Sequence, residues 1–197
     1  MGLEDSVDIH TLHSAYAGIS GAVYADRVLI SKSVINNLAT LDISLSPLYP
    51  YYELVIMGYV PVTDNAVLYL RVSTDNGATF DAGVAAYAWD DFIFNALGTA
   101  QEGSLGDSEI HLSGASDGVS SSTSDGLNAY LTIYSSRISP RWQINGGCMY
   151  KEGATTVFAR TLNSGQYLTS GANVNAIRLL SSSGNLSSGT VYLYGLP

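Results

Sequence analysis

Few side chains in this chain have the types and spacing that metal binding or nucleophilic catalysis requires. His10 and His13 form an H-x-x-H pair, which on a helix could present two imidazoles to a metal ion, but neither a third ligand nor a general base lies near them in the sequence. His111, in EIHLSG, has no neighbouring constellation of cysteine or aspartate, and we interpret it as an ordinary strand residue. Neither a nucleophile elbow nor a P-loop is predicted. The sequence therefore predicts no metal, no cofactor and no catalytic residue.

Two adjacent carboxylates, Asp90 and Asp91, follow Trp89 and could belong to a carbohydrate site. Adjacent residues of a β-strand face opposite sides of the sheet, so the two side chains are not expected to act together. A glycosidase would need a second carboxylate from elsewhere in the chain, which the sequence does not identify. We therefore interpret the protein as non-enzymatic.

The composition of the 197-residue chain excludes several partners. Only 13% of the residues are charged, against roughly 25% in typical globular proteins, and the net charge is −9. The only lysines are Lys32 and Lys151, so no basic patch is predicted, and neither nucleic acid nor an anionic membrane is an expected partner. No run approaches the length of a membrane helix. The acidic start, MGLEDSVDIH, does not resemble a secretory signal, and we interpret its match to the myristoylation pattern as chance.

The dominant hydrophobic period is two, which is typical of β-strands. In TLDISLS, apolar residues alternate with polar ones, and AVLYLRVST repeats the pattern. The segment YYELVIMGYV is apolar on both faces, which indicates a strand that is covered on both sides or whose outer face meets another subunit. Roughly ten such segments, separated by turn residues, predict an all-β fold, an antiparallel jelly-roll-like β-sandwich spanning residues 26–197. Residues 1–25 are predicted to form a short N-terminal arm outside it.

Three local predictions complete the fold. The single cysteine, Cys148, cannot form an internal disulfide and is predicted to be a small core residue. Residues 114–126, GASDGVSSSTSDG, are small and polar and are predicted to form an exposed mobile loop. The final stretch, IRLLSSSGNLSSGTVYLYGLP, predicts two strands that pair across a Ser/Gly turn, the last one lying inside a sheet because both of its faces are apolar.

The most specific local motif is STDNGATF. Its residues Ser73, Asp75, Gly77, Thr79 and Phe80 match S-x-D-x-G-x-T-[FW], which resembles the Asp-box of sialidase-type β-propellers. In that family the motif shapes a hairpin turn, with the aspartate accepting backbone N–H bonds and the aromatic ring packing beneath. Asn76 and Gly77 suit the positive φ angles of such a turn. A propeller needs several copies and this chain has one, so the motif predicts a hairpin and not a sialidase.

Two longer blocks carry a broader resemblance. The first block contains Tyr52, Leu54, Ile56, Pro61, Leu68, Leu70, Arg71, Val72, Ser73, Asp75, Gly77 and Phe80, and the second contains Ser183, Gly184, Asn185, Ser188, Gly189, Thr190, Leu193, Tyr194 and Gly195. At these positions the chain resembles a β-sandwich family of tailed-bacteriophage virion proteins, exterior parts of the particle such as head decorations and head or tail fibres. The resemblance covers about a third of the chain and leaves residues 90–175 unmatched.

The resemblance implies a structural protein of the virion, made in the host cytoplasm, that cements the capsid or forms a fibre. Expected partners are further copies of itself, with a trimer favoured, other virion proteins such as the major capsid protein, and a host-surface glycan. Tyr69, Tyr130 and Tyr134 are candidate interface residues, because interfaces are depleted in charge and enriched in tyrosine. The alternative is a carbohydrate-binding module or receptor-binding adhesin, suggested by fourteen tyrosines. The sequence leaves open head or tail location and a cementing or receptor-binding role.

Overall fold

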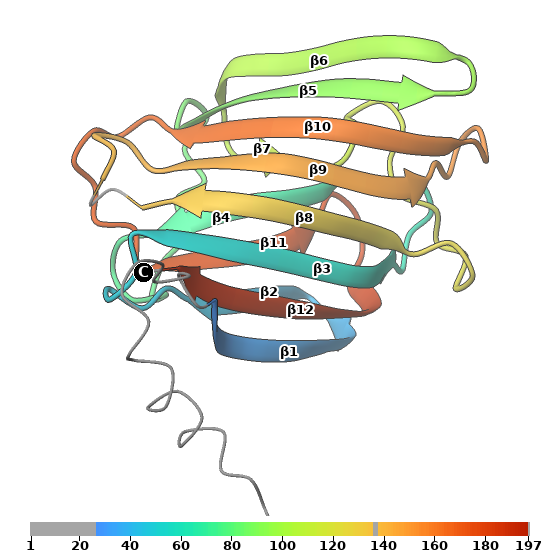
Figure 1. Ribbon diagram of the computed structural model, residues 1–197. Coiled ribbons are helices and arrows are strands. Elements are labelled where there is room, and N and C mark those ends of the chain that lie inside the picture. The colour runs from blue at the N-terminus through green and yellow to red at the C-terminus, as the bar shows by residue number, and fades with distance from the viewer. Residues whose placement is uncertain (1–26, 136–137, 197) are drawn as a thin grey trace, which may run out of the picture.

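The computed structural model describes residues 27–135 and 138–196, which fold into twelve β-strands and no helix (Figure 1). The predicted all-β class is confirmed. The predicted N-terminal arm, with His10 and His13, lies outside the described residues. The strands are β1 (Val28–Leu38), β2 (Thr40–Ser44), β3 (Tyr51–Pro61), β4 (Leu68–Ser73), β5 (Tyr87–Asn95), β6 (Gly98–Asp107), β7 (Ile110–His111), β8 (Leu127–Tyr134), β9 (Gln143–Lys151), β10 (Phe158–Tyr167), β11 (Ala176–Ser181) and β12 (Leu186–Leu196).

The strands form two antiparallel sheets that pack as a sandwich. The large sheet has the order β1-β12-β3-β8-β9-β10-β5-β6 and the small sheet the order β2-β11-β4-β7. Strands of the first half of the chain pair with strands of the second half: β1 with β12, β2 with β11, β3 with β8 and β4 with β7. Successive strands from β1 to β4 alternate between the sheets, which is the jelly-roll arrangement that the sequence predicted.

Two hairpins are inserted into this jelly roll and widen only the large sheet. The β5–β6 hairpin enters between β4 and β7, and the β9–β10 hairpin enters between β8 and β11. They pair with each other through β10 and β5 and join the jelly roll where β9 pairs with β8. As a result, the large sheet extends well beyond the edge of the small one (Figure 1).

The core lies between the sheets and explains the two-residue period. On β3, the side chains of Tyr52, Leu54 and Ile56 point inward and are buried, while their neighbours point outward. Leu70 of β4 and Ile177 of β11 cover them from the small sheet and are fully buried. Alternation along each strand therefore places one apolar set in the core and the other on the surface.

The last strand occupies an interior position. β12 lies between β1 and β3, and its Val191 and Leu193 are buried, so its predicted place inside a sheet is confirmed. The predicted pairing of the two final strands is wrong, because β11 belongs to the small sheet and pairs with β2 and β4. The Ser/Gly stretch between them is a crossover from one sheet to the other.

Two further predictions need correction. Strand β6 was missed because its sequence, GTAQEGSLGD, is polar and small, as suits an exposed edge strand. Residues 114–126 do not form a wholly exposed loop: Val119 is fully buried in the core and bridges Ala66 and Glu152. A single apolar residue therefore anchors this polar segment, while Ala115, Ser116 and residues 122–124 remain exposed.

Candidate functional site

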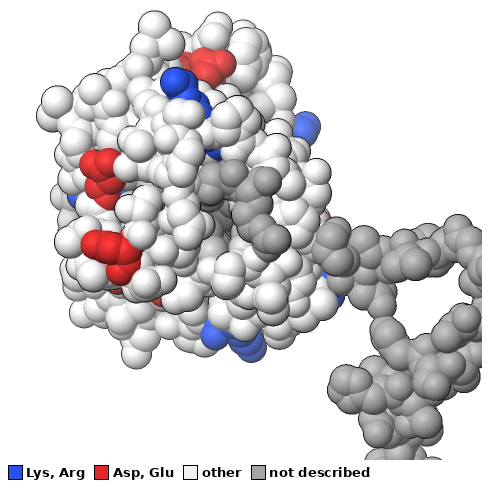
Figure 2. All heavy atoms as spheres, turned by 90° about the vertical axis from the view of Figure 1, so that its left-hand side faces the viewer, with Lys and Arg blue, Asp and Glu red and all other residues white. Residues whose placement is uncertain are grey.

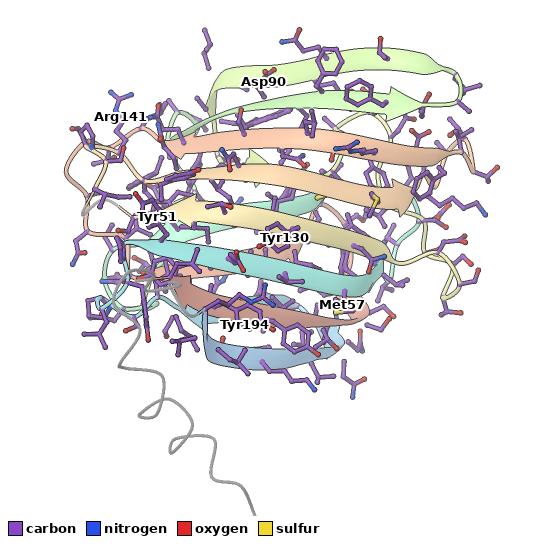
Figure 3. The ribbon with its side chains drawn as sticks, viewed as in Figure 1. Tyr51, Met57, Asp90, Tyr130, Arg141 and Tyr194 are labelled. Carbon is purple, nitrogen blue, oxygen red and sulfur yellow. The ribbon has the colours of Figure 1, made fainter. Side chains whose placement is uncertain are left out.

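The outer face of the large sheet is the most distinctive surface of the described chain. The small sheet covers the other side of the large sheet, so side chains pointing away from the core meet solvent (Figure 3). Charges are sparse on the protein surface; Figure 2 shows one end of the sandwich, where most atoms belong to uncharged residues. What distinguishes regions of this surface is therefore the balance of apolar and uncharged polar side chains.

One half of this face is apolar, and strand register aligns its side chains into rows. One row runs across the strands through direct partners: Tyr192 of β12, Val55 of β3 and Tyr130 of β8. It continues through Gly147 of β9 to the outward residues of β10 and β5. Met57, Tyr130 and Met149 each expose about half of their surface, at 52%, 49% and 50%. We call the following residues the apolar half: Val34, Val55, Met57, Phe92, Phe94, Tyr130, Met149, Leu162 and Tyr192.

Two glycines shape the centre of the apolar half. A Cβ on Gly146, whose φ is +153°, would lie 2.2 Å from the carbonyl oxygen of Tyr130, and one on Gly147 would lie 2.8 Å from that of Thr161. Only glycine fits where β9 approaches its neighbours so closely. Gly147 is the direct partner of Tyr130 and Leu162 on the outer face, and its missing side chain contributes to a shallow hollow of about 580 Å³ between them. An inserting side chain from another molecule would find both apolar walls and space there.

The other half of the face carries mostly uncharged polar side chains, together with the carboxylate of Asp90. One row pairs Thr132, Asn145, Ser164 and Asp90, and the next pairs Tyr134, Gln143, Gln166 and Ala88. We call these residues the polar half; Figure 3 shows Asp90 at one end of it and Tyr130 near the centre of the sheet. A second hollow, of about 360 Å³, lies over the polar half and is rimmed by Leu105 from the β6 edge.

The three candidate interface tyrosines do not share one surface. Tyr130 and Tyr134 both point outward from β8 on the large sheet, Tyr130 in the apolar half and Tyr134 in the polar half. Tyr69 lies on the small sheet, where it is half-buried and its ring packs 4.6 Å from that of His111. Sequence reasoning found two residues of the outer face but could not find the rows, because a row exists only once the strand register is known.

His111 is packed between aromatic rings. Its imidazole stacks on Trp89 with centroids 3.8 Å apart, and the Tyr69 ring covers the opposite side. Burial lowers the pKa of His111, against the opposing effect of Asp107, whose carboxylate is 3.8 Å from Nε2. The stacked ring therefore acts as a packing element of the β7 edge. Among the described residues no group of three or more His, Cys, Asp or Glu side chains could hold a metal ion.

Chelation tests the expectation that the protein needs no metal. Adding EDTA should leave the melting temperature unchanged, because His111 has no partner ligands and the His10–His13 pair lacks a third. Differential scanning fluorimetry with and without added Zn²⁺ provides the measurement. A large drop in melting temperature on chelation would contradict this expectation for the whole chain.

The two adjacent aspartates face opposite sides of the sheet, as predicted. Asp90 is exposed in the polar half, whereas Asp91 is completely buried beneath it. Asn163 Nδ2 donates to Asp91 Oδ1 at 2.7 Å, and Oδ2 has no hydrogen-bond partner among the described residues. Burial is the main cause that raises the pKa of Asp91, to about 8. Cys148, predicted as a core residue, is indeed buried, and burial also raises the pKa of its thiol.

The segment from Gly114 to Gly118, GASDG, has the letter spacing Gly-x-Ser-x-Gly of a nucleophile elbow. The geometry is different, because Ser116 is exposed on a bend and no helix follows it in the described chain. Its backbone N–H donates to Glu102 at 3.1 Å, and a Cβ at Gly118 would clash with the Asn65 carbonyl. The glycines serve close packing, and this segment offers no elbow for a nucleophilic serine.

The Asp-box turn has the predicted local geometry but joins different strands. Asp75 accepts hydrogen bonds from Thr79 N and Thr79 Oγ1 at 2.9 and 2.6 Å, and Asn76 and Gly77 have φ angles of 61° and 83°. The Arg178 guanidinium lies 4.0 Å from the centre of the half-buried Phe80 ring. The predicted hairpin is wrong, because β4 belongs to the small sheet and β5 to the large one. The motif shapes a crossover.

Acid should remove the contribution of Asp75 to stability. The hydrogen bonds from Thr79 are the main cause that lowers the pKa of Asp75, to about 2. Because this folded-state pKa lies below the unfolded value, the stabilisation is complete above about pH 4 and disappears as the pH falls through about 2. Asp75→Asn should therefore melt below the wild type at pH 7, and the gap should narrow between pH 4 and pH 2. A gap that is constant with pH would contradict this role for the carboxylate.

Comparisons with known proteins add no family to this description. Neither the scan against protein-family models nor the searches of curated proteins and of solved structures gives a match. No helix within the described ranges is long and apolar enough to cross a membrane.

Proposed function

We propose that the protein is a non-catalytic structural protein on the exterior of a tailed-phage virion, and that it assembles with further copies of itself through the apolar half of the large sheet. Two observations support this proposal. The first is the spatial relation between the two sequence blocks that carry the family resemblance. The second is an exposed apolar surface, which on soluble proteins marks a contact with another molecule.

The two blocks form one structural unit although about a hundred residues separate them. β3 and β4 come from the first block, and the second block contributes β12 and the turn before it. β3 pairs with β12 across the large sheet, and the backbone N–H of Val62 donates to the backbone carbonyl of Asn185 in the turn at 2.9 Å. Matched residues that are distant in the sequence but pair in the fold indicate a shared packing unit, which matched residues scattered over the structure would not. This pairing is the observation that carries the proposal.

Charge favours a second copy as the occupant of the apolar half. The chain has a net charge of −9, yet the charged residues aligned with the apolar rows are Lys32 and Arg160, both positive. An acidic surface of a neighbouring copy would therefore be attracted to this region. In a cyclic trimer each contact joins two different patches, so such a complementary arrangement can close into a ring.

Substitution in the apolar half tests the assembly. Tyr130→Glu with Leu162→Glu should convert an oligomer to a monomer, because two charges would be desolvated on either side of the central hollow. Val84→Glu is the matched control, since Val84 is 86% exposed on the loop before β5 and outside the rows. Light scattering measures the mass, and an unchanged far-UV circular dichroism spectrum with a cooperative melt shows that the fold is intact. An oligomer that survives the double substitution would contradict assembly through this half.

Location on the particle needs a separate experiment. Purified virions of the phage that encodes the chain should contain the protein by mass spectrometry, and their cryo-electron microscopy density should hold the jelly roll on head or tail. The same cryo-electron microscopy density would also reveal subunits that form an oligomer only on the capsid and not in solution. Purified particles that lack the protein would refute the virion proposal. Assembly in solution would still be tested separately, by light scattering.

A further inference from the structure

We propose that the polar half of the large sheet, around the hollow of about 360 Å³, is a binding site for a neutral saccharide. This inference concerns the isolated protein and does not depend on its location on a virion. It rests on the chemistry of the lining side chains and on their regular spacing across four paired strands.

The lining has the functional groups that recognise sugar hydroxyls. Gln143, Asn145 and Gln166 supply amide donors and acceptors, and Ser164 and Asp90 add a hydroxyl and a carboxylate. The side chains of Gln143 and Asn145 make no hydrogen bond to other described residues and are exposed, so their full bonding capacity faces the hollow. A carboxylate and several amides with free hydrogen-bond donors and acceptors suit a ligand that both donates and accepts hydrogen bonds at many positions.

Strand geometry fixes these groups on a grid. Neighbouring strands are about 4.8 Å apart, and outward residues on one strand are about 6.7 Å apart. The direct partners Gln143 and Gln166 thus form one pair, and Asn145 and Ser164 form the adjacent pair. Such spacing suits the hydroxyls distributed around a sugar ring, and because the groups sit on sheet strands their backbone positions are fixed before binding.

Contacts outside the hollow orient two of the groups. Gln101 Nε2 donates to Asp90 Oδ1 at 3.1 Å, and Arg141 Nη1 approaches Gln166 Oε1 at 3.5 Å. These contacts leave Asp90 Oδ2 and the Gln166 amide group directed to a ligand. At one side Tyr134 offers an aromatic ring, braced edge-on by Tyr51 at a centroid distance of 5.6 Å, on which the C–H face of a sugar can stack.

The same lining disfavours other ligands. No lysine or arginine lines the hollow, and Asp90 would repel a phosphate, a sulfate or an acidic sugar. Apolar surface also lines the hollow, from residues such as Trp89, Leu105 and Tyr134, and it can pack against the C–H faces of a sugar ring. A macromolecular partner would be expected on the apolar half, which adjoins this hollow at Asn145. A neutral saccharide is the ligand class that uses the amides, the carboxylate and the ring together.

Binding can be tested with the full chain on an array of neutral mono- and oligosaccharides built from glucose, galactose, rhamnose and N-acetylglucosamine. Any hit is then titrated by calorimetry. We expect at least one to bind, Gln143→Ala with Gln166→Ala to weaken it at least tenfold, and Tyr134→Phe to retain binding that Tyr134→Ala loses. Asn36→Ala, an exposed amide at the opposite edge of the same face, is the matched control and should bind as the wild type does.

Two outcomes would overturn the proposal. One is the absence of binding to every neutral saccharide at millimolar concentration, and the other is binding that the Gln143, Gln166 and Tyr134 variants do not change. Melting temperatures equal to the wild type would exclude loss of fold as the cause of weakened binding. Because no step of this test uses a virion or an oligomer, its failure would leave the proposed function to its own experiments.

Discussion

Deleting residues 190–197 is expected to leave an insoluble or molten protein that no longer unfolds in one cooperative transition. The deletion removes most of β12, including Val191 and Leu193, which are 1% and 0% exposed. Buried aliphatic side chains contribute about 1.5–3 kcal/mol each, and a whole domain is stable by only about 5–15 kcal/mol. The deletion also leaves β1 and β3 without their shared partner, so two unpaired strand edges face each other across a gap.

Circular dichroism melting and binding of a hydrophobic dye measure this effect. Deletion of residues 1–22 is the control: it should preserve a cooperative melt, because the sandwich begins after this segment, while weakening attachment to the particle if the arm docks there. A C-terminal deletion that melts like the parent would show that β12 is dispensable. Loss of cooperativity on N-terminal deletion would place the arm in the core.

The second large effect concerns pH and the buried carboxyl group of Asp91. Its folded-state pKa of about 8 lies above the unfolded value of about 3.9, so the folded protein binds a proton that the unfolded chain has lost. The free energy of unfolding must then fall as the pH rises between these two values, by up to about 1.4 kcal/mol per pH unit. From pH 4 to pH 7 the loss is on the order of 4 kcal/mol for this group.

Asp91→Asn should remove that dependence, since the amide keeps the shape of the side chain and has no proton to lose. We expect the variant to be close to the wild type at pH 4 and clearly more stable at pH 7 in urea denaturation. Asp90→Asn is a matched control on the exposed face of the same strand, where the change should be small at both pH values. An Asp91→Asn variant that is less stable than the wild type at pH 7 would indicate an ionised, well-partnered carboxylate.

The strands could be predicted because their burial is one-sided. The alternation of apolar and polar residues predicts β2 and β4 directly. The opposite orientation of Asp90 and Asp91 follows from strand geometry alone. Strand β6 was not predicted, because an edge strand without a buried face has no hydrophobic period in its sequence. The pairing of β11 with β12 was wrongly predicted because adjacent strands usually form a hairpin, and local sequence does not encode which sheet a strand enters.

The site could be predicted only in part. Tyrosine content identified Tyr130 and Tyr134, but composition cannot say that Tyr69 lies on the other sheet. The division of the outer face into an apolar and a polar half depends on partners such as Gln143 and Gln166, which are 23 positions apart and meet through register. Residues 90–175, which lie outside the two matched blocks, supply most of the polar half.

The pairing of the first half of the chain with the second has a consequence for the order of folding events. β1 cannot complete its ladder until β12 has been synthesised, so the large sheet must wait for nearly the whole chain. Folds dominated by such distant pairings reach the native state slowly, in milliseconds to seconds for small β domains. Until then the apolar outward residues and the open edge of β3 are exposed together, and crowded expression should favour aggregation. Slower synthesis at lower temperature should accordingly raise the soluble yield.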